Sequence, residues 1–360
     1  MFSSFKELMD HFVSIGVPGF DAIILKDGQC VFRYSGGYSD AENQIPIQGN
    51  ERYNLYSCSK MVTCTAALQL WEKGLLSLDA PLYTYLPEYR NVTVRQGDQI
   101  LPAKNAITIR HLLTMTAGFS YDTRTPSLKR LMAETNGDPS TREVARALAE
   151  EPLLFEPGTQ WNYSLGHDVL GAVIEVVAGI PFSKYVQENI FQPLGMHNST
   201  IGATDEELAS VSPIYRFDRS TGTRTCLGKT DYARITFGPS FESGGAGCIS
   251  TVEDFVKFLE ALRIGDIILK RETIDMMTSD QLTDAQRQTY WWKHRCSYGF
   301  GVHCAKRGDS EHFFSWGGAA GAEPLIHRES GITFFYARHI LDMNNDAIND
   351  AMREHLRSLL

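Results

Sequence analysis

Ser57 and Lys60, three residues apart, have the residue types and spacing needed for nucleophilic catalysis. A serine hydroxyl is a poor nucleophile unless a neighbouring base takes its proton. Lys60 is the only charged residue between Arg52 and Glu72, and the segment after it, MVTCTAALQLW, is apolar on nearly every face of a helix. Burial there disfavours the ammonium form, and the spacing brings Lys60 one turn from Ser57. We therefore expect Lys60 to accept the proton of Ser57, beside N–H groups of the first helical turn that could bind an oxyanion.

The Ser-x-x-Lys spacing is weak support by itself, because Ser3 and Lys6 satisfy it as well. In the alternative interpretation, Ser57 only caps the helix and the Lys60 side chain extends to solvent. These residues alone leave both interpretations open.

Two further segments contain groups that could act on the same substrate. Tyr163 follows a Pro-Gly turn and precedes a helix that should begin near Leu165, and a helix N-terminus favours the phenolate form. Residues 315–319, SWGGA, follow a predicted strand, and consecutive glycines let a ligand approach backbone N–H groups closely. The alternatives are a tyrosine that only packs and a simple turn.

The nearest approach to a metal-binding pattern is formed by His294, Cys296, His303 and Cys304, without Cys-x-x-Cys or His-Glu-x-x-His. We interpret these residues as alternating positions of a hairpin. The sequence also contains no Gly-x-Gly-x-x-Gly and no Walker loop for nucleotides, and no Gly-x-Ser-x-Gly nucleophile elbow. We therefore expect neither a metal nor an organic cofactor.

Other candidate groups have plainer interpretations. We expect His111 and His167 to be helix residues with local partners, and Cys58 and Cys64 to be small packing residues.

Composition limits the partners and the compartment. The 360 residues include 34 basic and 43 acidic side chains, a net charge of -9, which disfavours nucleic acids as ligands. The most hydrophobic stretch, residues 165–182, contains His167, Asp168 and Glu175, so no membrane span and no membrane partner are expected. Seven cysteines without regular spacing and an acidic amphipathic N-terminus indicate reduced thiols and a cytoplasmic location.

The elements that must position these residues fall into three parts. Residues 1–40 predict a helix and two strands joined at Asp27-Gly28, residues 57–215 are mainly helical, and the segment after residue 230 returns to helices, strands and a final helix. This order predicts an α/β (α+β) fold, with an antiparallel sheet built from both termini and an inserted all-helical domain. The domains would be residues 1–75 with 230–360, and residues 76–229. The segments around 121–129 and 214–229 are expected to be loops that shape the substrate site.

The chain resembles the superfamily of serine β-lactamases and penicillin-binding proteins, in the branch with class C β-lactamases, DD-peptidases and family VIII carboxylesterases. Besides SCSK, the resemblance rests on several blocks in the expected order: WEKGLLSLDAPLYTYLPE, ITIRHLLTMTAGFSYD, EPGTQWNYSLGHDVLGAVIEVVAGIPF, PLGM and SGGAGCISTVEDFVKFLEAL. It covers nearly the whole chain. The family's fold is an antiparallel sheet flanked by terminal helices with a helical domain between, and its active site lies in the cleft between the two domains.

The resemblance implies a role for each candidate residue. Ser57 would be the acylated nucleophile, and Lys60 and Tyr163 would share its proton and later help to activate water. The backbone N–H groups of Ser57 and Ala319 would form the oxyanion hole.

Two departures from the family pattern concern the substrate. Leu165 stands where class C enzymes have asparagine, and Trp316 stands where the third motif has lysine or histidine, ahead of Gly317 and Gly318. We expect these four residues to contact substrate. Replacing a polar side chain and a cation by apolar groups disfavours anionic β-lactams and peptidoglycan stems and favours neutral esters.

The sequence thus predicts a cytoplasmic serine hydrolase that cleaves short-chain carboxylic esters through an acyl-enzyme on Ser57. The alternatives are a β-lactamase or DD-peptidase-like amidase, an acyltransferase, and a binding or sensor protein that stays acylated. The sequence leaves the oligomeric state open.

Overall fold

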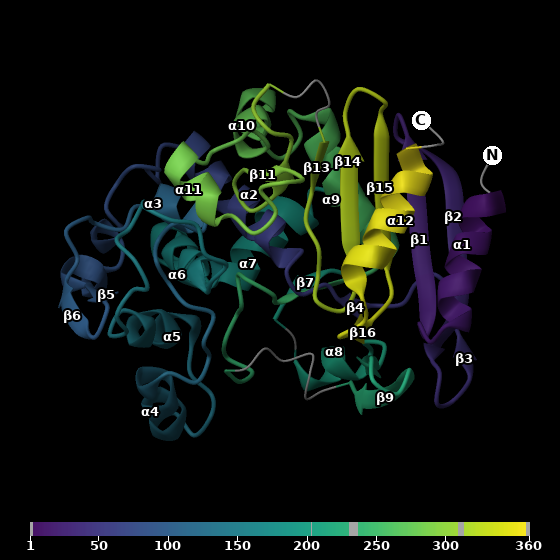
Figure 1. The fold of residues 1–360 in the computed structure, drawn as a ribbon, viewed down its shortest axis with the longest axis horizontal. Coiled ribbons are helices and arrows are strands. Elements are labelled where there is room, and N and C mark those ends of the chain that lie inside the picture. Colours follow the sequence, from purple (N-terminus) through teal and green to yellow (C-terminus); the bar gives the residue numbers. More distant parts are fainter. Residues whose placement is uncertain (1–2, 203, 230–236, 309–312, 358–360) are drawn as a thin grey trace.

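The computed structural model describes residues 3–202, 204–229, 237–308 and 313–357. Its largest element is a sheet of eight strands in the order β11-β12-β13-β14-β15-β1-β2-β3, with antiparallel neighbours throughout. In chain order these strands are β1 (Gly19–Lys26), β2 (Gln29–Asp40), β3 (Ile45–Pro46), β11 (Ser297–Tyr298), β12 (His303–Cys304), β13 (Phe313–Ser315), β14 (Glu323–His327) and β15 (Ile332–Ala337). The first and last parts of the chain therefore share one sheet, as Figure 1 shows in purple and yellow. The predicted antiparallel sheet built from both termini is confirmed.

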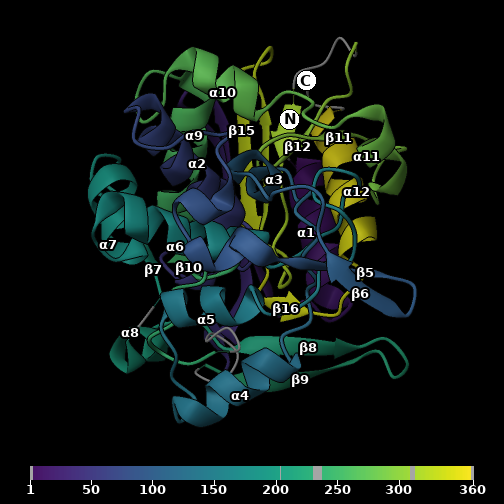
Figure 2. The ribbon, with the colours of Figure 1, turned by 90° about the vertical axis from the view of Figure 1, so that its left-hand side faces the viewer.

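Helices cover both faces of this sheet. The terminal helices α1 (Ser3–Ser14) and α12 (Asn345–Arg357) lie on one face and α9 (Val252–Ile264) lies on the other (Figures 1 and 2). Alternate residues of β1 serve the two faces, because successive strand side chains point in opposite directions. Ala22 and Ile24 belong to the cluster under α1 and α12, whereas Ile23 and Leu25 belong to the main core.

A group of helices packs beside the sheet around α2 (Ser59–Glu72). Every residue of α2 from Ser59 to Leu70 is buried, as expected for an apolar helix at the centre of a domain. The other helices are α3 (Ile109–Leu113), α4 (Pro126–Glu134), α5 (Thr141–Leu148), α6 (Gly166–Ala178), α7 (Phe182–Val186), α8 (Asp205–Ala209), α10 (Arg271–Met277) and α11 (Asp284–Thr289). Short 3-10 helices span Leu82–Thr84 and Pro87–Asn91, and a π-helical turn spans Gln187–Phe191.

Three small sheets complete the described structure. They are β4-β10-β7, β16-β8-β9 and β5-β6. Their strands are β4 (Tyr53–Asn54), β5 (Thr93–Gln96), β6 (Gln99–Pro102), β7 (Thr200–Ile201), β8 (Ile214–Asp218), β9 (Thr223–Gly228), β10 (Cys248–Ser250) and β16 (Ile340–Leu341). The expectation of a loop over residues 214–229 is therefore wrong, because β8 and β9 form a hairpin paired to β16.

Several turns and helix ends have the backbone conformation that their residue types favour. Asp27 and Gly28 both take positive φ values, 50° and 81°, which suits the two-residue turn between β1 and β2. Gly179 caps α6 with φ 70° in the left-handed region. Residues 297–304 form two short strands, β11 and β12, and Gly301 with φ 71° lies between them.

No single helix among the described residues is both long and apolar enough to cross a membrane. One pair, Gly166–Ala178 and Phe182–Phe191, meets the length and composition test only together, and it is bent by 77°.

Candidate active site

Ser57 lies immediately before α2, with Lys60 in the first turn of that helix. The helix begins at Ser59 with Cys58 as its N-cap residue, and no side chain caps it. Lys60 Nζ lies 3.2 Å from Ser57 Oγ and donates a 2.6 Å hydrogen bond to the Gly245 carbonyl. Lys60 has no exposed surface. The alternative in which Ser57 only caps the helix and Lys60 reaches solvent is therefore wrong.

The backbone before Ser57 is strained. Tyr56 has φ 46°, a left-handed conformation that is rare for a bulky residue and typical of functional sites. Asn54 Oδ1 accepts its N–H at 3.0 Å, and the Ser59 hydroxyl donates to its carbonyl. This sharp bend places Ser57 at the beginning of α2 but outside its regular helix.

Tyr163 meets Ser57 from the other side. Its hydroxyl lies 2.5 Å from Ser57 Oγ, although the two residues are 106 positions apart. Tyr163 precedes α6, as predicted, but the expectation that the helix dipole favours its phenolate is wrong. Burial raises the pKa of Tyr163 well above its usual value, and the Asp168 charge adds to this, while the hydrogen bond with Ser57 acts in the opposite direction.

Aromatic rings surround the Ser57, Lys60 and Tyr163 side chains. The Tyr121 ring stacks on Tyr163 with centroids 5.0 Å apart and planes 9° apart, and Trp316 and Trp291 lie 5.9 and 6.0 Å from the same ring. Lys60 Nζ lies 4.7 Å from the Tyr163 ring centroid. Tyr121 and Trp291 are 42% and 58% exposed, so they form the solvent side of this cluster.

The Trp316–Ala319 segment follows β13 and passes close to the backbone that leads to Ser57. A Cβ atom on Gly318 would lie 2.4 Å from the Leu55 carbonyl oxygen, so only glycine permits this approach. Ala319 is exposed. A Cβ atom on Gly317 would lie 2.7 Å from Glu323 Oε2.

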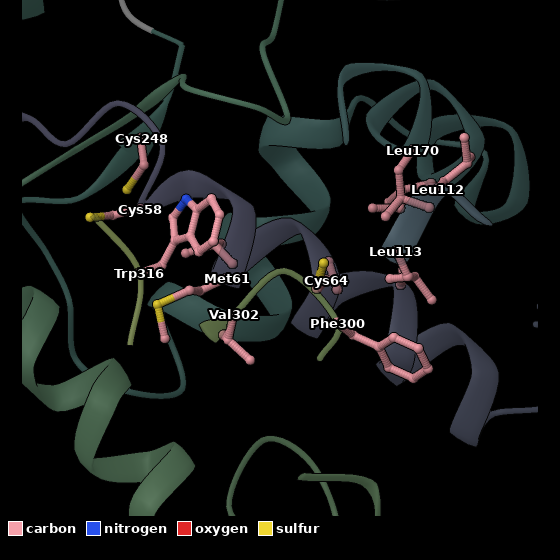
Figure 3. Close-up of a cluster of buried hydrophobic side chains, with 14 of the residues drawn as sticks. Cys58, Met61, Cys64, Leu112, Leu113, Leu170, Cys248, Phe300, Val302 and Trp316 are labelled. Carbon is pink, nitrogen blue, oxygen red and sulfur yellow. The ribbon is translucent and has the colours of Figure 1, made fainter. Parts of the chain in front are cut away.

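Trp316 and Leu165 are both almost fully buried, at 3% exposure each. The Trp316 indole packs against Tyr298 and His303, and Figure 3 shows it among the side chains around α2, near Met61. Leu165 belongs to the main core and precedes α6. Of the predicted substrate contacts, Trp316 therefore lies directly beside Tyr163, whereas the Leu165 side chain packs inside the molecule.

Of the two histidines, His111 has a local partner, as predicted, whereas the partner of His167 lies on α2. His111 forms a reciprocal capping box with Thr108, and burial lowers the pKa of His111 to about 4. His167 Nε2 lies 3.0 Å from Cys64 Sγ. Cys58 and Cys64 are buried in the core that Figure 3 shows.

Of the four residues of the weak metal pattern, His303 and Cys304 form β12, which pairs with β11, so the hairpin interpretation is confirmed for these two. Cys296 directly precedes β11 and His294 lies in a turn before it, so these two are outside the hairpin strands. His303 contacts Tyr290 and Cys296. Among the residues with described positions, no group of three or more His, Cys, Asp or Glu side chains could hold a metal ion.

Sequence reasoning missed a buried polar cluster behind Lys60. Asp168, in the first turn of α6, accepts hydrogen bonds from Ser243 Oγ at 2.5 Å and from the Gly245 N–H at 3.0 Å. Burial raises the pKa of Asp168, and the Lys60 charge opposes that rise. The available signals were an acidic residue inside an apolar helix and the paired glycines of SGGAG.

Comparison with known proteins agrees with this geometry. A family model described as beta-lactamase matches residues 4–358. The chain belongs to the beta-lactamase family. The resemblance deduced from the motifs is therefore confirmed over almost the full length.

The similar proteins include esterases, acyltransferases and a hydrolase with acyltransferase activity. Esterase EstB of Burkholderia gladioli is 31% identical over 341 residues, covering 87% of this chain and 83% of EstB. Lovastatin esterase of Penicillium rubens is 33% identical over 247 residues, 66% of this chain and 61% of that enzyme. The solved structure of EstCE1, described as a hydrolase with promiscuous acyltransferase activity, matches with a TM-score of 0.78 at 25% identity, covering 96% of this chain and 97% of EstCE1.

Proposed function

We propose that this protein is a serine hydrolase that cleaves short-chain carboxylic esters through an acyl-enzyme on Ser57. The observation that carries the proposal is that Ser57 Oγ contacts both Lys60 Nζ and Tyr163 OH. A hydroxyl flanked by an amine and a phenol has a proton acceptor and a proton donor within hydrogen-bond reach. The esterases among its relatives support the same chemistry.

In this mechanism Ser57 Oγ attacks the ester carbonyl carbon while its proton passes to the amine of Lys60. The N–H groups of Ser57 and Ala319 stabilise the resulting oxyanion. When the carbon–oxygen bond to the alcohol breaks, the alkoxide takes a proton through Tyr163, which Lys60 replenishes. Water then attacks the acyl-enzyme by the reverse proton transfers and releases the acid.

The substrate proposal rests on the apolar surroundings of Tyr163. Trp316 occupies the position that a cation holds in many relatives, and Trp291 and Tyr121 add exposed rings, which favours neutral esters over anionic β-lactams. Gly317 and Gly318 would let the ester approach the backbone, and Leu165 would shape the site through packing. The mechanism uses no cofactor and no metal.

Acyl transfer to an alcohol or amine is a second candidate activity, because the description of EstCE1 combines a hydrolase with acyltransferase activity. The two outcomes differ only in whether water or another acceptor attacks the acyl-enzyme. Adding a series of alcohols and measuring new ester against free acid separates them.

We further propose that the protein works in the cytoplasm on small molecules and binds neither nucleic acid nor a membrane. All seven cysteines lie in the described residues and are free thiols, which supports a reducing compartment. The net charge of -9 opposes association with nucleic acids.

Initial rates on p-nitrophenyl acetate, p-nitrophenyl butyrate and nitrocefin test the proposal. We expect fast ester turnover that Ser57→Ala abolishes, with little nitrocefin hydrolysis. Ser3→Ala is the matched control, because Ser3 begins the other Ser-x-x-Lys segment and is exposed. Dominant nitrocefin turnover would contradict the substrate, and a long-lived adduct on Ser57 without turnover would favour the acylated binding protein.

A further inference from the structure

A buried carboxylate lies behind Lys60 and is linked to it through one residue. Asp168 Oδ1 accepts the Gly245 N–H at 3.0 Å, and the carbonyl of the same Gly245 accepts Lys60 Nζ at 2.6 Å. Asp168 is 4% exposed and Lys60 is not exposed at all. A carboxylate and an amine thus face each other across Gly245, without direct contact.

The backbone between them is shaped for this approach. A Cβ atom on Gly245 would lie 2.6 Å from Asp168 Oδ2, and one on Gly244 would lie 2.2 Å from the His167 carbonyl oxygen. Glycine is required at both positions because a side chain would separate the segment from α6. Thr63 Oγ1 of α2 also donates a 2.6 Å hydrogen bond to the Gly244 carbonyl, so the segment is held from both helices.

Hydrogen bonding alone does not explain an acidic residue at position 168. An asparagine could accept the same two hydrogen bonds from Ser243 and Gly245 without a buried charge. Burying a carboxylate is unfavourable unless the charge is compensated. The feature that needs a reason is therefore the negative charge of Asp168, and the nearby basic group is Lys60.

We propose that Asp168 is a positioning residue for Lys60. This inference rests on the proposed function. The carboxylate holds the Gly245 carbonyl against one N–H of the lysine amine, which directs the amine lone pair toward Ser57 Oγ. When Lys60 takes the Ser57 proton and the ester C–O bond forms, the negative charge of Asp168 stabilises the new ammonium group.

The other titratable groups around Lys60 are neutral or weakly charged. Burial lowers the pKa of His167 and raises the pKa of the Cys58 and Cys64 thiols, so these groups carry no charge near neutral pH. Tyr163 and Tyr121 present ring faces to the amine. Asp168 therefore supplies the negative charge that acts on Lys60 among the described residues that surround it.

The test compares Asp168→Asn with Asp254→Asn on p-nitrophenyl acetate. Asp254 is a matched control because it is also a buried carboxylate in the first turn of a helix, α9, and it accepts the Asn198 N–H and pairs with Lys257 away from Ser57. We expect Asp168→Asn to lower kcat by about tenfold, part of the roughly 10²–10⁴-fold that a positioned acid or base contributes. Asp254→Asn should stay close to wild type.

The pH profile distinguishes positioning from a merely structural role. Loss of the negative charge makes the lysine easier to deprotonate, so the acid limb of kcat/KM should move to lower pH in Asp168→Asn. An unchanged kcat together with an unchanged limb would overturn the inference. If Asp168→Asn does not fold, Ser243→Ala replaces it, because this variant removes a hydrogen bond that stabilises the Asp168 carboxylate. The acid limb of kcat/KM must then move in the same direction by a smaller amount. A wild-type pH profile in Ser243→Ala would overturn the inference as well.

Covalent labelling keeps this result separate from the proposed function. The rate at which a p-nitrophenyl phosphonate modifies Ser57, followed by intact mass, reports the nucleophile without ester turnover. A wild-type protein that neither labels nor cleaves esters overturns the proposed function and this inference together. Normal wild-type labelling with the same rate and pH dependence in Asp168→Asn overturns this inference alone.

Discussion

Two buried carboxylates of this protein face cations in different ways. Asp168 approaches Lys60 only through Gly245, whereas Glu323 forms a direct ion pair with Arg353. Burial raises the pKa of both carboxyl groups, and the facing cation opposes that rise in each case. The guanidinium of Arg353 cannot serve as a proton acceptor, whereas a lysine amine can. The cluster of Asp168 and Lys60 is therefore suited to proton transfer, and the cluster of Glu323 and Arg353 is suited to stabilising the fold.

The Glu323 cluster connects the C-terminal helix to the glycine turn. Arg353 of α12 contacts Glu323 at the start of β14 and lies 3.4 Å from Ser315 Oγ at the end of β13. Asn349 of the same helix donates a 2.9 Å hydrogen bond to Glu323 Oε2. Both ends of the segment that contains Trp316–Ala319 are therefore held by α12.

Lys60→Met should have the largest effect, because it removes the proton acceptor from the separated pair. We expect kcat/KM for p-nitrophenyl acetate to fall roughly 10³-fold, about 4 kcal/mol in the barrier. Lys6→Met, in the other Ser-x-x-Lys segment, should keep wild-type rates. Activity that survives in Lys60→Met would place the base elsewhere and contradict a role of the Asp168 and Lys60 cluster in proton transfer.

Glu323→Gln should lower the free energy of unfolding by about 3 kcal/mol, because it leaves the Arg353 charge without its carboxylate in a buried site. Urea unfolding measures this change. A double-mutant cycle of Glu323→Gln with Arg353→Met should give a larger coupling energy than one of Asp168→Asn with Lys60→Met. Equal coupling energies would show that direct contact does not distinguish the two pairs.

Asp168→Asn should change the pH dependence of stability. Burial raises the pKa of Asp168 in the folded protein above the pKa of about 3.9 in the unfolded chain. The stability that this carboxyl group contributes is therefore fully present below the unfolded pKa and is lost as the pH rises through the folded pKa. The variant should therefore gain stability relative to wild type as pH rises from about 4 toward neutrality, by about 1.4 kcal/mol for each pKa unit of the shift. Urea unfolding across this range measures the difference, and a gap that stays constant with pH would contradict it.

Trp291→Ala should have the smallest effect, because this exposed ring lies outside both charged clusters. We expect KM for p-nitrophenyl butyrate to rise about threefold, less than about 1 kcal/mol, with kcat and stability close to wild type. Tyr38→Ala, an exposed ring on β2 with 40% exposure, is the control and should leave KM unchanged. A large loss of kcat in Trp291→Ala would mean that the ring positions Tyr163.

The sequence predicted the parts of this fold that depend on local pattern. The apolar character of α2 and the turn at Asp27-Gly28 are short-range signals, and each is present in the structure. The antiparallel sheet and the family are also confirmed. The division into domains 1–75 with 230–360 and 76–229, and the roles of the site residues, stay predictions.

Contacts between residues that are distant in the chain depend on the tertiary structure. The three-residue spacing of Ser57 and Lys60 favoured a contact, but a Lys60 that reached solvent satisfied the same spacing, so burial of the lysine was needed to decide it. The contact of Tyr163 with Ser57 and that of Asp168 with Gly245 join segments far apart in the chain, and their geometry depends on how α6 packs on α2. Burial likewise reversed the expected phenolate at Tyr163, because the solvation of a charge depends on the whole fold and not on the adjacent residues.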